Sequence, residues 1–442
     1  MSTETIFALA SGRGRAGVAV VRLSGPGAMA SLKALTNQPL PKPRQAALRN
    51  LHIDNKKILI DQSLVLIFES PNSFTGEDVV ELHLHGGPAI LAALFEELSS
   101  RDGLRIAEPG EFTRRAFEHG KLDLTEAEGL GDLVNAETAA QAQQALRQMR
   151  GELGEIYEGW RSELISSLAH LEADIDFPDE DLPCGVAAAM APKIAKLRQA
   201  MENHLADGHR GEKIRDGLDV VILGAPNVGK SSLLNWLAGR EAAIVSDLAG
   251  TTRDIVEVHM DLAGYPVTIA DTAGLRDSTD AIEREGVRRA RERAEMADIR
   301  ILMTAADAPE APPEFVGLAQ SGDFHLINKT DAYDAGSARA TFKDAQWVSV
   351  KTGEGLEGFL KNLEEDVIAR LDVSGAPALT QVRHRRALEE CVACLTRFDA
   401  APDPELAAED IRLAARSLAR ITGRIDVEDI LDVIFGDFCI GK

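Results

Sequence analysis

The stretch GAPNVGKSS, residues 224–232, constrains the fold of this 442-residue chain more than any other segment. It matches the pattern G-x-x-x-x-G-K-[ST], in which glycines let backbone N–H groups turn towards phosphate oxygens. An apolar strand, LDVVIL, precedes it and an apolar helical segment, LLNWLAG, follows it. This order predicts a phosphate-binding loop at a helix N-terminus, with Lys230 reaching the β- and γ-phosphates and Ser231 ligating Mg²⁺.

Three further segments extend this nucleotide site. Asp271 ends a strand in DTAG and suits a second-shell magnesium carboxylate, while Gly274 frees its N–H for the γ-phosphate. NKTD, residues 328–331, ends another strand, and the Asp331 carboxylate can accept hydrogen bonds from both N1–H and the 2-amino group of guanine. Adenine has neither donor, so the motif favours guanine. Residues 349–351, SVK, resemble the last base-contacting loop of GTPases, with an ordinary strand-end turn as the alternative.

The region between these motifs is where GTPase switches belong. SDLAGTTRD, residues 246–254, occupies the first-switch position, and Thr252 is placed to close on Mg²⁺ when a γ-phosphate is present. Leu275 follows DTAG where small GTPases carry a water-orienting glutamine, so either hydrolysis is absent or another group orients the water. The predicted nucleotide-binding residues are Asn227, Val228, Gly229, Lys230, Ser231, Ser232, Ser246, Asp247, Leu248, Ala249, Gly250, Thr251, Thr252, Asp271, Thr272, Ala273, Gly274, Asn328, Lys329, Asp331, Ser349, Val350 and Lys351.

The periodicity of apolar residues divides the chain into an α+β multidomain protein. Residues 1–120 alternate short strands (18–25, 58–70 and 78–87) with turns and a helix, which predicts an N-terminal α/β domain. Residues 121–215 and 374–442 carry helical stripes, one of which, from Leu146 to Ile175, predicts a single long helix. Residues 216–373 alternate strands and helices, which predicts an α/β module with a parallel sheet. We therefore expect this module to be inserted between two helical segments that pack together.

Composition narrows the class of protein. A net charge of −23 opposes broad, non-specific nucleic-acid binding, although it leaves room for a local basic patch. No apolar run is long enough to span a bilayer, and the N-terminus has no positive region before its apolar residues, so we expect neither a membrane span nor a signal peptide. Four cysteines are too few for a disulfide scaffold, which predicts a reduced, cytoplasmic protein. CVAC, residues 391–394, lies on a helical stripe and is predicted to be core.

Two N-terminal patterns have familiar but weak interpretations. GRGRAG, residues 12–17, matches G-x-G-x-x-G, but a strand follows where a dinucleotide fold requires a helix, so we reject that site. In ELHLHGG, strand alternation places Glu81, His83 and His85 on one face. A zinc site there is conceivable, but H-x-H without further ligands is a weak signal.

Several of these motifs, together with others, resemble the motifs of one known family over essentially the whole chain. Asn227 in the phosphate loop, GTTRD, DTAGLR and the terminal CIGK resemble the MnmE (TrmE) family of bacterial tRNA modification GTPases. GRGRAGVAVVRLSG, SFTGEDVVELHLHGG and PGEFTRRAFEHGKLDL add to this resemblance. It implies an N-terminal folate-binding domain, a helical domain built from two segments and an inserted Ras-like P-loop GTPase domain.

The resemblance implies a potassium ion at the phosphates in place of an arginine finger, which would stabilise charge developing during phosphoryl transfer. Arg253 and Arg276 are the competing cations, and an ordinary surface role is as good an interpretation for each. The implied potassium ligands are a side-chain oxygen of Asn227 and backbone carbonyls of Ser246, Leu248 and Thr251.

The resemblance also answers the question that Leu275 raises. It implies that Glu283 orients the attacking water, directly or through a second water. The sequence alone does not separate Glu283 from Asp280 or Glu285, because a charged helix face commonly carries such a cluster. The family further implies that the competent switches form when two GTPase modules meet face to face.

At the N-terminal domain the resemblance implies a folate pocket. There Glu81 would accept hydrogen bonds from the pterin amino and ring N–H groups, and Arg22, Lys121 and Lys442 would complete the site. Without the resemblance each would be an ordinary surface charge. Cys439 is a candidate for the modification chemistry, with a thiol nucleophile, a structural thiol and a shape-only role all open.

The implied function joins GTP hydrolysis to tRNA modification. Members form homodimers through the N-terminal domain and act with the flavoprotein MnmG, in a heterotetramer, on the wobble uridine of certain tRNAs. An aminomethyl-type group is installed at C5, with carbon from 5-formyl- or methylene-tetrahydrofolate. The alternatives are a ribosome-assembly or RNA-chaperone GTPase, although no KH-type GXXG module follows the GTPase, and a membrane-remodelling GTPase, although no basic amphipathic anchor is visible.

Overall fold

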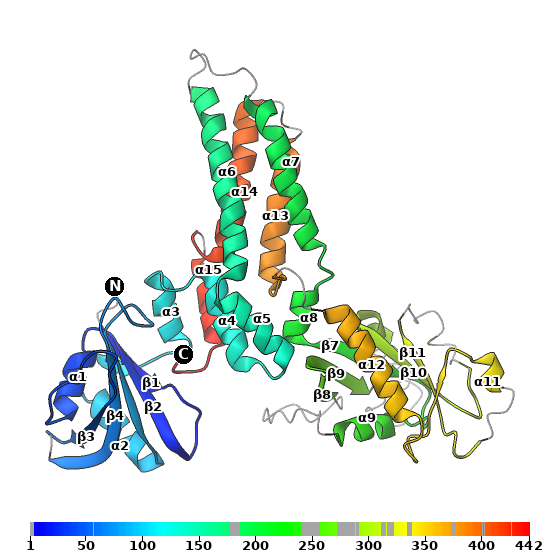
Figure 1. Cartoon of the computed structure of the whole chain (residues 1–442), viewed down its shortest axis with the longest axis horizontal. Helices are drawn as coiled ribbons and strands as arrows, with labels where there is room; N and C mark the ends of the chain where they lie inside the picture. The colour runs from blue at the N-terminus through cyan, green and yellow to red at the C-terminus, as the bar shows by residue number, and fades with distance from the viewer. Residues whose placement is uncertain are drawn as a thin grey trace. The chain divides into compact units, whose positions relative to one another are not determined.

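The computed structural model divides into two compact units. Unit 1 comprises Met1–Gly131, Gln148–Val186 and Ala401–Lys442, and unit 2 comprises Asp132–Arg147 and Ala187–Ala400 (Figure 1). The structure describes residues 4–55, 57–176, 186–240, 257–271, 288, 291–310, 315, 322–333, 338–372, 377–399, 401, 403–425 and 427–442.

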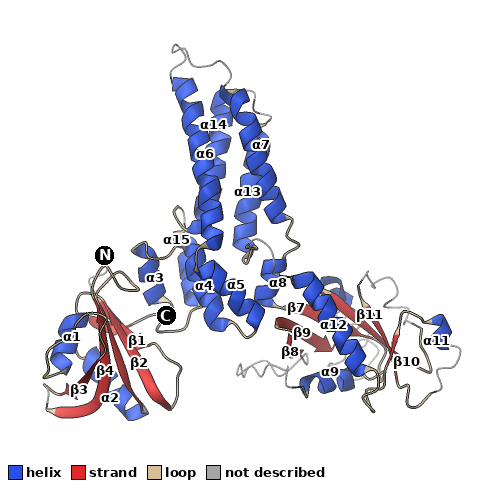
Figure 2. Cartoon of the chain, viewed as in Figure 1, coloured by secondary structure: helices blue, strands red, loops and turns tan. Residues whose placement is uncertain are grey.

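The first sheet forms the N-terminal part of unit 1. Its strands are β1 (Thr5–Leu9), β2 (Ala16–Ser24), β3 (Ala47–Ile53), β4 (Ile58–Phe68), β5 (Val79–Gly86) and β6 (Leu104–Ile106). They are ordered β3-β4-β5-β2-β1-β6, with all neighbours antiparallel except β1 and β6 (Figure 2). The alternating side chains of these strands pack against α1 (Ala28–Leu35) and α2 (Pro88–Ser99) in one buried core that includes Leu32 and Leu94.

A buried ion network fixes the segment between β4 and β5. Arg115, on α3 (Glu111–Glu118), has a side chain only 3% exposed. Its guanidinium lies 2.9 Å from Glu77 Oε2 and 3.0 Å from Glu111 Oε1, and it donates to the Glu4 carbonyl at 3.1 Å. A buried charge is tolerated when it is paired in this way, so the network holds three chain segments together.

Replacing Arg115 by leucine will destabilise the protein strongly. The change leaves the Glu77 and Glu111 carboxylates in a buried site without their shared partner, and breaking a buried pair costs about 3–5 kcal/mol. Chemical denaturation followed by circular dichroism measures the effect. Arg114→Leu is the matched control, since Arg114 forms more exposed pairs that contribute about 1 kcal/mol or less. Equal losses in the two variants would contradict the account.

The helices of both units show where the predicted long helix was wrong. Instead of one helix over 146–175, α5 ends at Met149 and α6 begins at Glu152. Gly151 between them has φ +86, a left-handed conformation that suits glycine and interrupts a helix.

The helices outside the two α/β parts of the chain are α4 (Leu124–Asn135), α5 (Ala139–Met149), α6 (Glu152–Asp176), α7 (Val186–Leu205), α8 (Arg210–Asp216), α13 (Val382–Phe398), α14 (Pro404–Thr422) and α15 (Glu428–Gly436).

The two helical segments that flank the α/β module pack together, as the sequence predicts. Within unit 1, α6 lies along α14 (Figure 1) and both helices bury apolar stripes. Arg412 of α14 pairs with Glu172 of α6 at 2.6 Å, and the Thr422 hydroxyl donates to Glu158 at 2.8 Å. Segments about 240 residues apart in sequence therefore form one helical layer.

Unit 2 contains the predicted α/β module. Its strands are β7 (Leu218–Leu223), β8 (Glu257–Leu262), β9 (Tyr265–Asp271), β10 (Ile299–Ala305), β11 (Phe324–Asn328) and β12 (Gln346–Trp347). Their order is β12-β11-β10-β7-β9-β8, parallel except for the antiparallel pair β8–β9. The edge strand β8 was missed in the sequence, although VEVHMDL alternates before an Ala263-Gly264 turn. The described part of this module also contains the short helix α11 (Ala338–Thr341).

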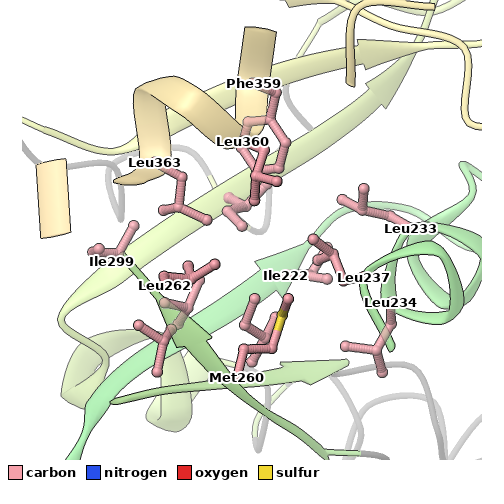
Figure 3. Close-up of a cluster of buried hydrophobic side chains, with 14 of the residues drawn as sticks. Ile222, Leu233, Leu234, Leu237, Met260, Leu262, Ile299, Phe359, Leu360 and Leu363 are labelled. Atoms are coloured by element: carbon pink, nitrogen blue, oxygen red, sulfur yellow. The ribbon is translucent and has the colours of Figure 1, made fainter. Parts of the chain in front are cut away.

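The core of this module fixes the elements that bear the nucleotide motifs. Figure 3 shows Leu233 and Leu237 of α9 (Lys230–Ala238), Phe359 of α12 (Leu356–Leu371) and Ile222 of β7 in one buried apolar cluster. All four of these side chains are fully buried. Burial of this kind contributes about 1.5–3 kcal/mol for each large apolar side chain, so the loop between β7 and α9 is held on a rigid base. Within the described ranges, no helix is both long and apolar enough to cross a lipid bilayer.

Candidate functional site

The predicted phosphate loop joins β7 to α9, and its backbone requires glycine at two positions. Gly224 has φ +148, and a Cβ there would lie 2.1 Å from the Met303 carbonyl oxygen. Gly229 has φ +111, and a Cβ there would lie 2.3 Å from the Asn328 side-chain nitrogen. Asn227 adopts a left-handed conformation at φ +63, which asparagine tolerates better than most residues. The loop therefore has the tight geometry that phosphate binding needs.

Lys230 is buried within this loop. Its ammonium group donates to the carbonyls of Gly224 at 2.7 Å and Ala225 at 2.9 Å. Burial lowers the pKa of Lys230, while the negative charge of Asp271 acts in the opposite direction. An ammonium held at the loop in this way can turn from backbone carbonyls to phosphate oxygens without leaving the site.

Ser231 and Asp271 form the described part of the predicted magnesium site. The Ser231 hydroxyl, at the first turn of α9, donates to Asp271 Oδ2 at 2.6 Å, and Asp271 ends β9 almost fully buried. A hydroxyl and a carboxylate are hard oxygen donors of the type that Mg²⁺ prefers. With Ser231 as a direct ligand and Asp271 behind it, these two residues fit the ion that the sequence predicts.

The base-binding motifs meet at the ends of β11 and β12. Asn328, 4% exposed, donates to the Val228 carbonyl at 2.8 Å and accepts from the Val350 N–H at 3.0 Å. The Ser349 hydroxyl donates to Asp331 at 2.7 Å, which lowers the pKa of Asp331, and Lys351 Nζ lies 3.8 Å from the same carboxylate. Asp331 is thus held as a charged acceptor three residues beyond the end of β11. These contacts favour a base-binding loop over an ordinary turn at 349–351.

The remaining predicted nucleotide residues differ in what the structure says of them. Ser232 is exposed on α9, Val228 is buried, and Lys329 takes a left-handed conformation at φ +67. Lying outside the described residues are Ser246, Asp247, Leu248, Ala249, Gly250, Thr251, Thr252, Arg253, Thr272, Ala273, Gly274, Leu275, Arg276, Asp280, Glu283 and Glu285. Of the implied potassium ligands, only Asn227 is described, and its side chain is exposed. The potassium site and Glu283 therefore stay predictions.

A second site is formed in unit 1 by Arg22 and Glu81, which lie opposite each other on β2 and β5. Arg22 places Nε at 3.0 Å and Nη2 at 2.9 Å from Glu81 Oε1. The guanidinium carbon lies 5.6 Å from the ring centre of Phe74 and 5.7 Å from that of Phe112. The sequence analysis did not predict a role for these two rings. Phe74 lies in SFTGED and Phe112 in EFTRRAF, and neither stands in a periodic pattern of apolar residues.

The C-terminal tail reaches the same part of unit 1. The Lys442 carbonyl accepts from the Phe112 N–H at 3.2 Å, and Ile440 forms a β-bridge with Pro109. Gly441 has φ +103, and a Cβ there would lie 2.1 Å from the Leu9 carbonyl oxygen, so only glycine fits. The tail is therefore seated between β1 and α3.

The two other residues predicted for this region lie beside these elements. Lys121 is folded against the β4–β5 segment, because a Cβ on Gly76 would meet its Cε at 3.3 Å. Gly76 is two residues from Phe74, so Lys121 borders the segment that carries this ring. Cys439 is an exposed free thiol on the tail, whereas Cys391 and Cys394 are buried, which confirms that CVAC belongs to a core.

The structure does not support a zinc site on β5. His83 Nε2 lies 3.6 Å from Glu81 Oε2, but His85 pairs with Asp61 at 2.7 Å. Among the described residues, no group of three or more histidine, cysteine, aspartate or glutamate side chains is arranged to hold a metal ion. Glu81 is instead held by Arg22, with its second oxygen towards His83.

A mainly parallel α/β sheet with a phosphate loop, a Ser231–Asp271 contact suited to Mg²⁺ and an Asn-Lys-x-Asp motif defines the class of P-loop GTPases. The chain belongs, more narrowly, to the MnmE family of tRNA modification GTPases. The MnmE helical domain matches residues 124–439, and the N-terminus of the GTP-binding protein TrmE matches residues 5–121. The protein is a GTPase that acts in tRNA modification.

Similar proteins span the whole chain. The tRNA modification GTPase MnmE of Parvibaculum lavamentivorans is 54% identical over 444 residues, which covers 99% of this chain and 100% of the relative. The mitochondrial 5-taurinomethyluridine-[tRNA] synthase subunit GTPB3 of Danio rerio is 46% identical, covering 99% and 93%. Among solved structures, the G domain of the T. maritima FeoB iron transporter is 24% identical. The match covers 34% of this chain and 98% of that domain, with a TM-score of 0.25.

Proposed function

We propose that this protein is a potassium-dependent GTPase that acts in the cytoplasm with the flavoprotein MnmG on the wobble uridine of certain tRNAs. The pair installs an aminomethyl-type group at C5, with carbon from 5-formyl- or methylene-tetrahydrofolate. One observation carries the folate part of this proposal. Arg22, Glu81, Phe112 and the C-terminal carbonyl of Lys442 converge in one region of unit 1.

The residues of this region suit the pterin ring of a folate. A pterin is flat and carries amino and ring N–H donors, and the Glu81 carboxylate is an acceptor held in place by Arg22. Phe74 and Phe112 supply aromatic surface beside that pair. The folate would supply the one-carbon unit, while these residues bind and orient it. Lys121 and Lys442 add positive charge, and Cys439 is the exposed thiol on the tail.

Replacing Glu81 by glutamine is expected to weaken binding of 5-formyltetrahydrofolate by about 10- to 100-fold, because a neutral amide cannot accept from two donors as a carboxylate does. Isothermal titration of the full-length protein measures this. Glu96→Gln on α2 is the matched control, with the same charge change at an exposed position, and it should bind as the wild type does. A wild type that does not bind the folate would defeat the proposed pocket.

At the GTP site, Ser231 and Thr252 ligate Mg²⁺, with Asp271 behind Ser231. Asn227 and the carbonyls of Ser246, Leu248 and Thr251 would hold K⁺, whose charge would stabilise the transition state of phosphoryl transfer. Glu283 orients the water in place of the residue after DTAG. The tight loop that Gly224 and Gly229 make, the Ser231–Asp271 contact and family membership support this assignment.

The link between the two sites is conformational in this proposal. The protein forms a homodimer through its N-terminal domain, and paired GTPase modules order their switches when they meet. Hydrolysis then drives a change of conformation, and the carbon transfer itself takes place at the folate site. The domain division that fits this scheme is 1–120, 121–215, 216–373 and 374–442.

A further inference from the structure

The β1–β2 connection of unit 1 is an exposed, glycine-rich hairpin with no role so far. Its base is closed by the Ala10 N–H donating to the Val20 carbonyl at 2.7 Å and the Val20 N–H donating to the Ser11 hydroxyl at 3.1 Å. Beyond that base, residues 12–18 (GRGRAGV) are all exposed. This is the segment whose G-x-G-x-x-G pattern does not belong to a dinucleotide fold.

Two arginines at the tip of this hairpin are free of carboxylates. Arg13 and Arg15 are exposed, and neither has an ion-pair partner among the described residues. Other arginines of the same unit, such as Arg22 and Arg115, are paired with glutamates. In a chain with a net charge of −23, two neighbouring unpaired guanidinium groups form a local cationic feature that can attract an anion.

The glycines leave space around these two cations. A Cβ at Gly12, Gly14 or Gly17 would meet nothing within 4 Å, and Gly14 has φ +111. Glycine on both sides of Arg13 and before Arg15 leaves the backbone open, so another molecule can approach its N–H groups closely, as phosphates do in other proteins. We refer to residues 12–17 as the arginine hairpin.

The arginine hairpin leaves the sheet next to the residues that seat the C-terminal tail. Gly441 packs against the Leu9 carbonyl and Ala10, which directly precede the hairpin. Leu9 is opposite Val21 in the β1–β2 register, one position from Arg22. The hairpin therefore continues along β2 to the Arg22–Glu81 pair: Arg15 is seven residues before Arg22, a reach of about 23–25 Å in extended chain.

We propose that Arg13 and Arg15 bind phosphates of the anticodon arm of tRNA and hold the wobble base at the Arg22–Glu81 site. This inference rests on the proposed function, because it takes tRNA and folate chemistry at that site as given. The wobble uridine must approach the one-carbon donor there, and an acidic protein repels a polyanion except where cations are concentrated. The arginine hairpin supplies such cations at the start of the strand that carries Arg22, and Lys442 adds a cation beside the site.

The test compares full-length wild type with Arg13→Gln/Arg15→Gln, using fluorescence anisotropy and an unmodified tRNA transcript. We expect the variant to bind about tenfold more weakly. Two lost single-strand phosphate contacts should also reduce the slope of log K against log salt by about 1.4. Lys33→Gln/Lys42→Gln, which removes two exposed lysines of the same unit, is the control for net charge and should bind tRNA as the wild type does.

Further arms separate the remaining outcomes. Titration with monoglutamyl 5-formyltetrahydrofolate should give the same affinity in wild type and hairpin variant. Unchanged tRNA binding by the variant would overturn the inference and leave the proposed function intact. Loss of affinity for a pentaglutamyl folate, with tRNA binding unchanged, would overturn it in favour of a folate-tail site. A wild type that binds no tRNA would count against both the inference and the proposed function.

Discussion

Replacing Asp331 by asparagine is expected to lower the affinity for GTP by about 10⁴-fold and to make xanthosine triphosphate the better ligand. In the proposed base site, the Asp331 carboxylate would accept from two guanine donors, N1–H and the 2-amino group. An asparagine amide places a donor against that amino group, whereas xanthine carries a carbonyl acceptor there. The Ser349 hydroxyl, which donates to Asp331 at 2.7 Å, can still donate to the amide oxygen, so the loop should stay in place.

Competition against a fluorescent GTP analogue measures this exchange for both triphosphates. Asp344→Asn is the matched control, because Asp344 is an exposed carboxylate of the same unit, and this variant should keep its preference for GTP. If Asp331→Asn bound GTP as tightly as the wild type, the assignment of the base site at NKTD would be wrong.

Replacing Glu283 by alanine is expected to slow GTP turnover by about 10²–10³-fold while GTP affinity stays within a few-fold of wild type. The reason is that a water-orienting carboxylate acts on the transition state and does not contact the nucleotide in the ground state. Single-turnover hydrolysis and equilibrium nucleotide binding separate the two effects.

The neighbours of Glu283 provide the controls. Asp280→Ala and Glu285→Ala remove a carboxylate from the same segment and should leave turnover close to wild type. Near-normal turnover in Glu283→Ala, with a large loss in one of these neighbours, would move the water-orienting role to that residue. Normal turnover in all three variants would mean that no carboxylate of this segment orients the water.

Much of the GTPase module could be predicted because its motifs are local. A phosphate loop needs a strand before it and a helix after it, and NKTD follows the end of a strand. The order of these motifs in the sequence therefore predicts the order of β7, α9 and β11. The strand β8 escaped because it carries no nucleotide motif, although it is as long as β7 and its side chains alternate. The break at Gly151 escaped because apolar spacing continues through a single left-handed residue.

The N-terminal site could be predicted only in part, and the reason is tertiary. The pairing of Arg22 with Glu81 follows from a register between β2 and β5 that no local pattern specifies. The C-terminal tail is held by packing of Gly441 against Leu9, which lies more than 400 residues away in sequence. Phe74 and Phe112 lie outside regular apolar periodicity, so their position around Arg22 became visible only with the structure.

The central claim is that a bound cation and Glu283, ordered together, take over the role of the water-orienting glutamine of small GTPases. In this chain Leu275 occupies the position of that glutamine. The most direct test is GTP turnover by the full-length protein in potassium and in sodium buffers of equal ionic strength, both with Mg²⁺. The account predicts turnover at least about tenfold faster in potassium, because the proposed site of Asn227 and the first-switch carbonyls would select that ion. Equal rates in the two buffers would contradict the cation site and return Arg253 and Arg276 as the charges that assist hydrolysis.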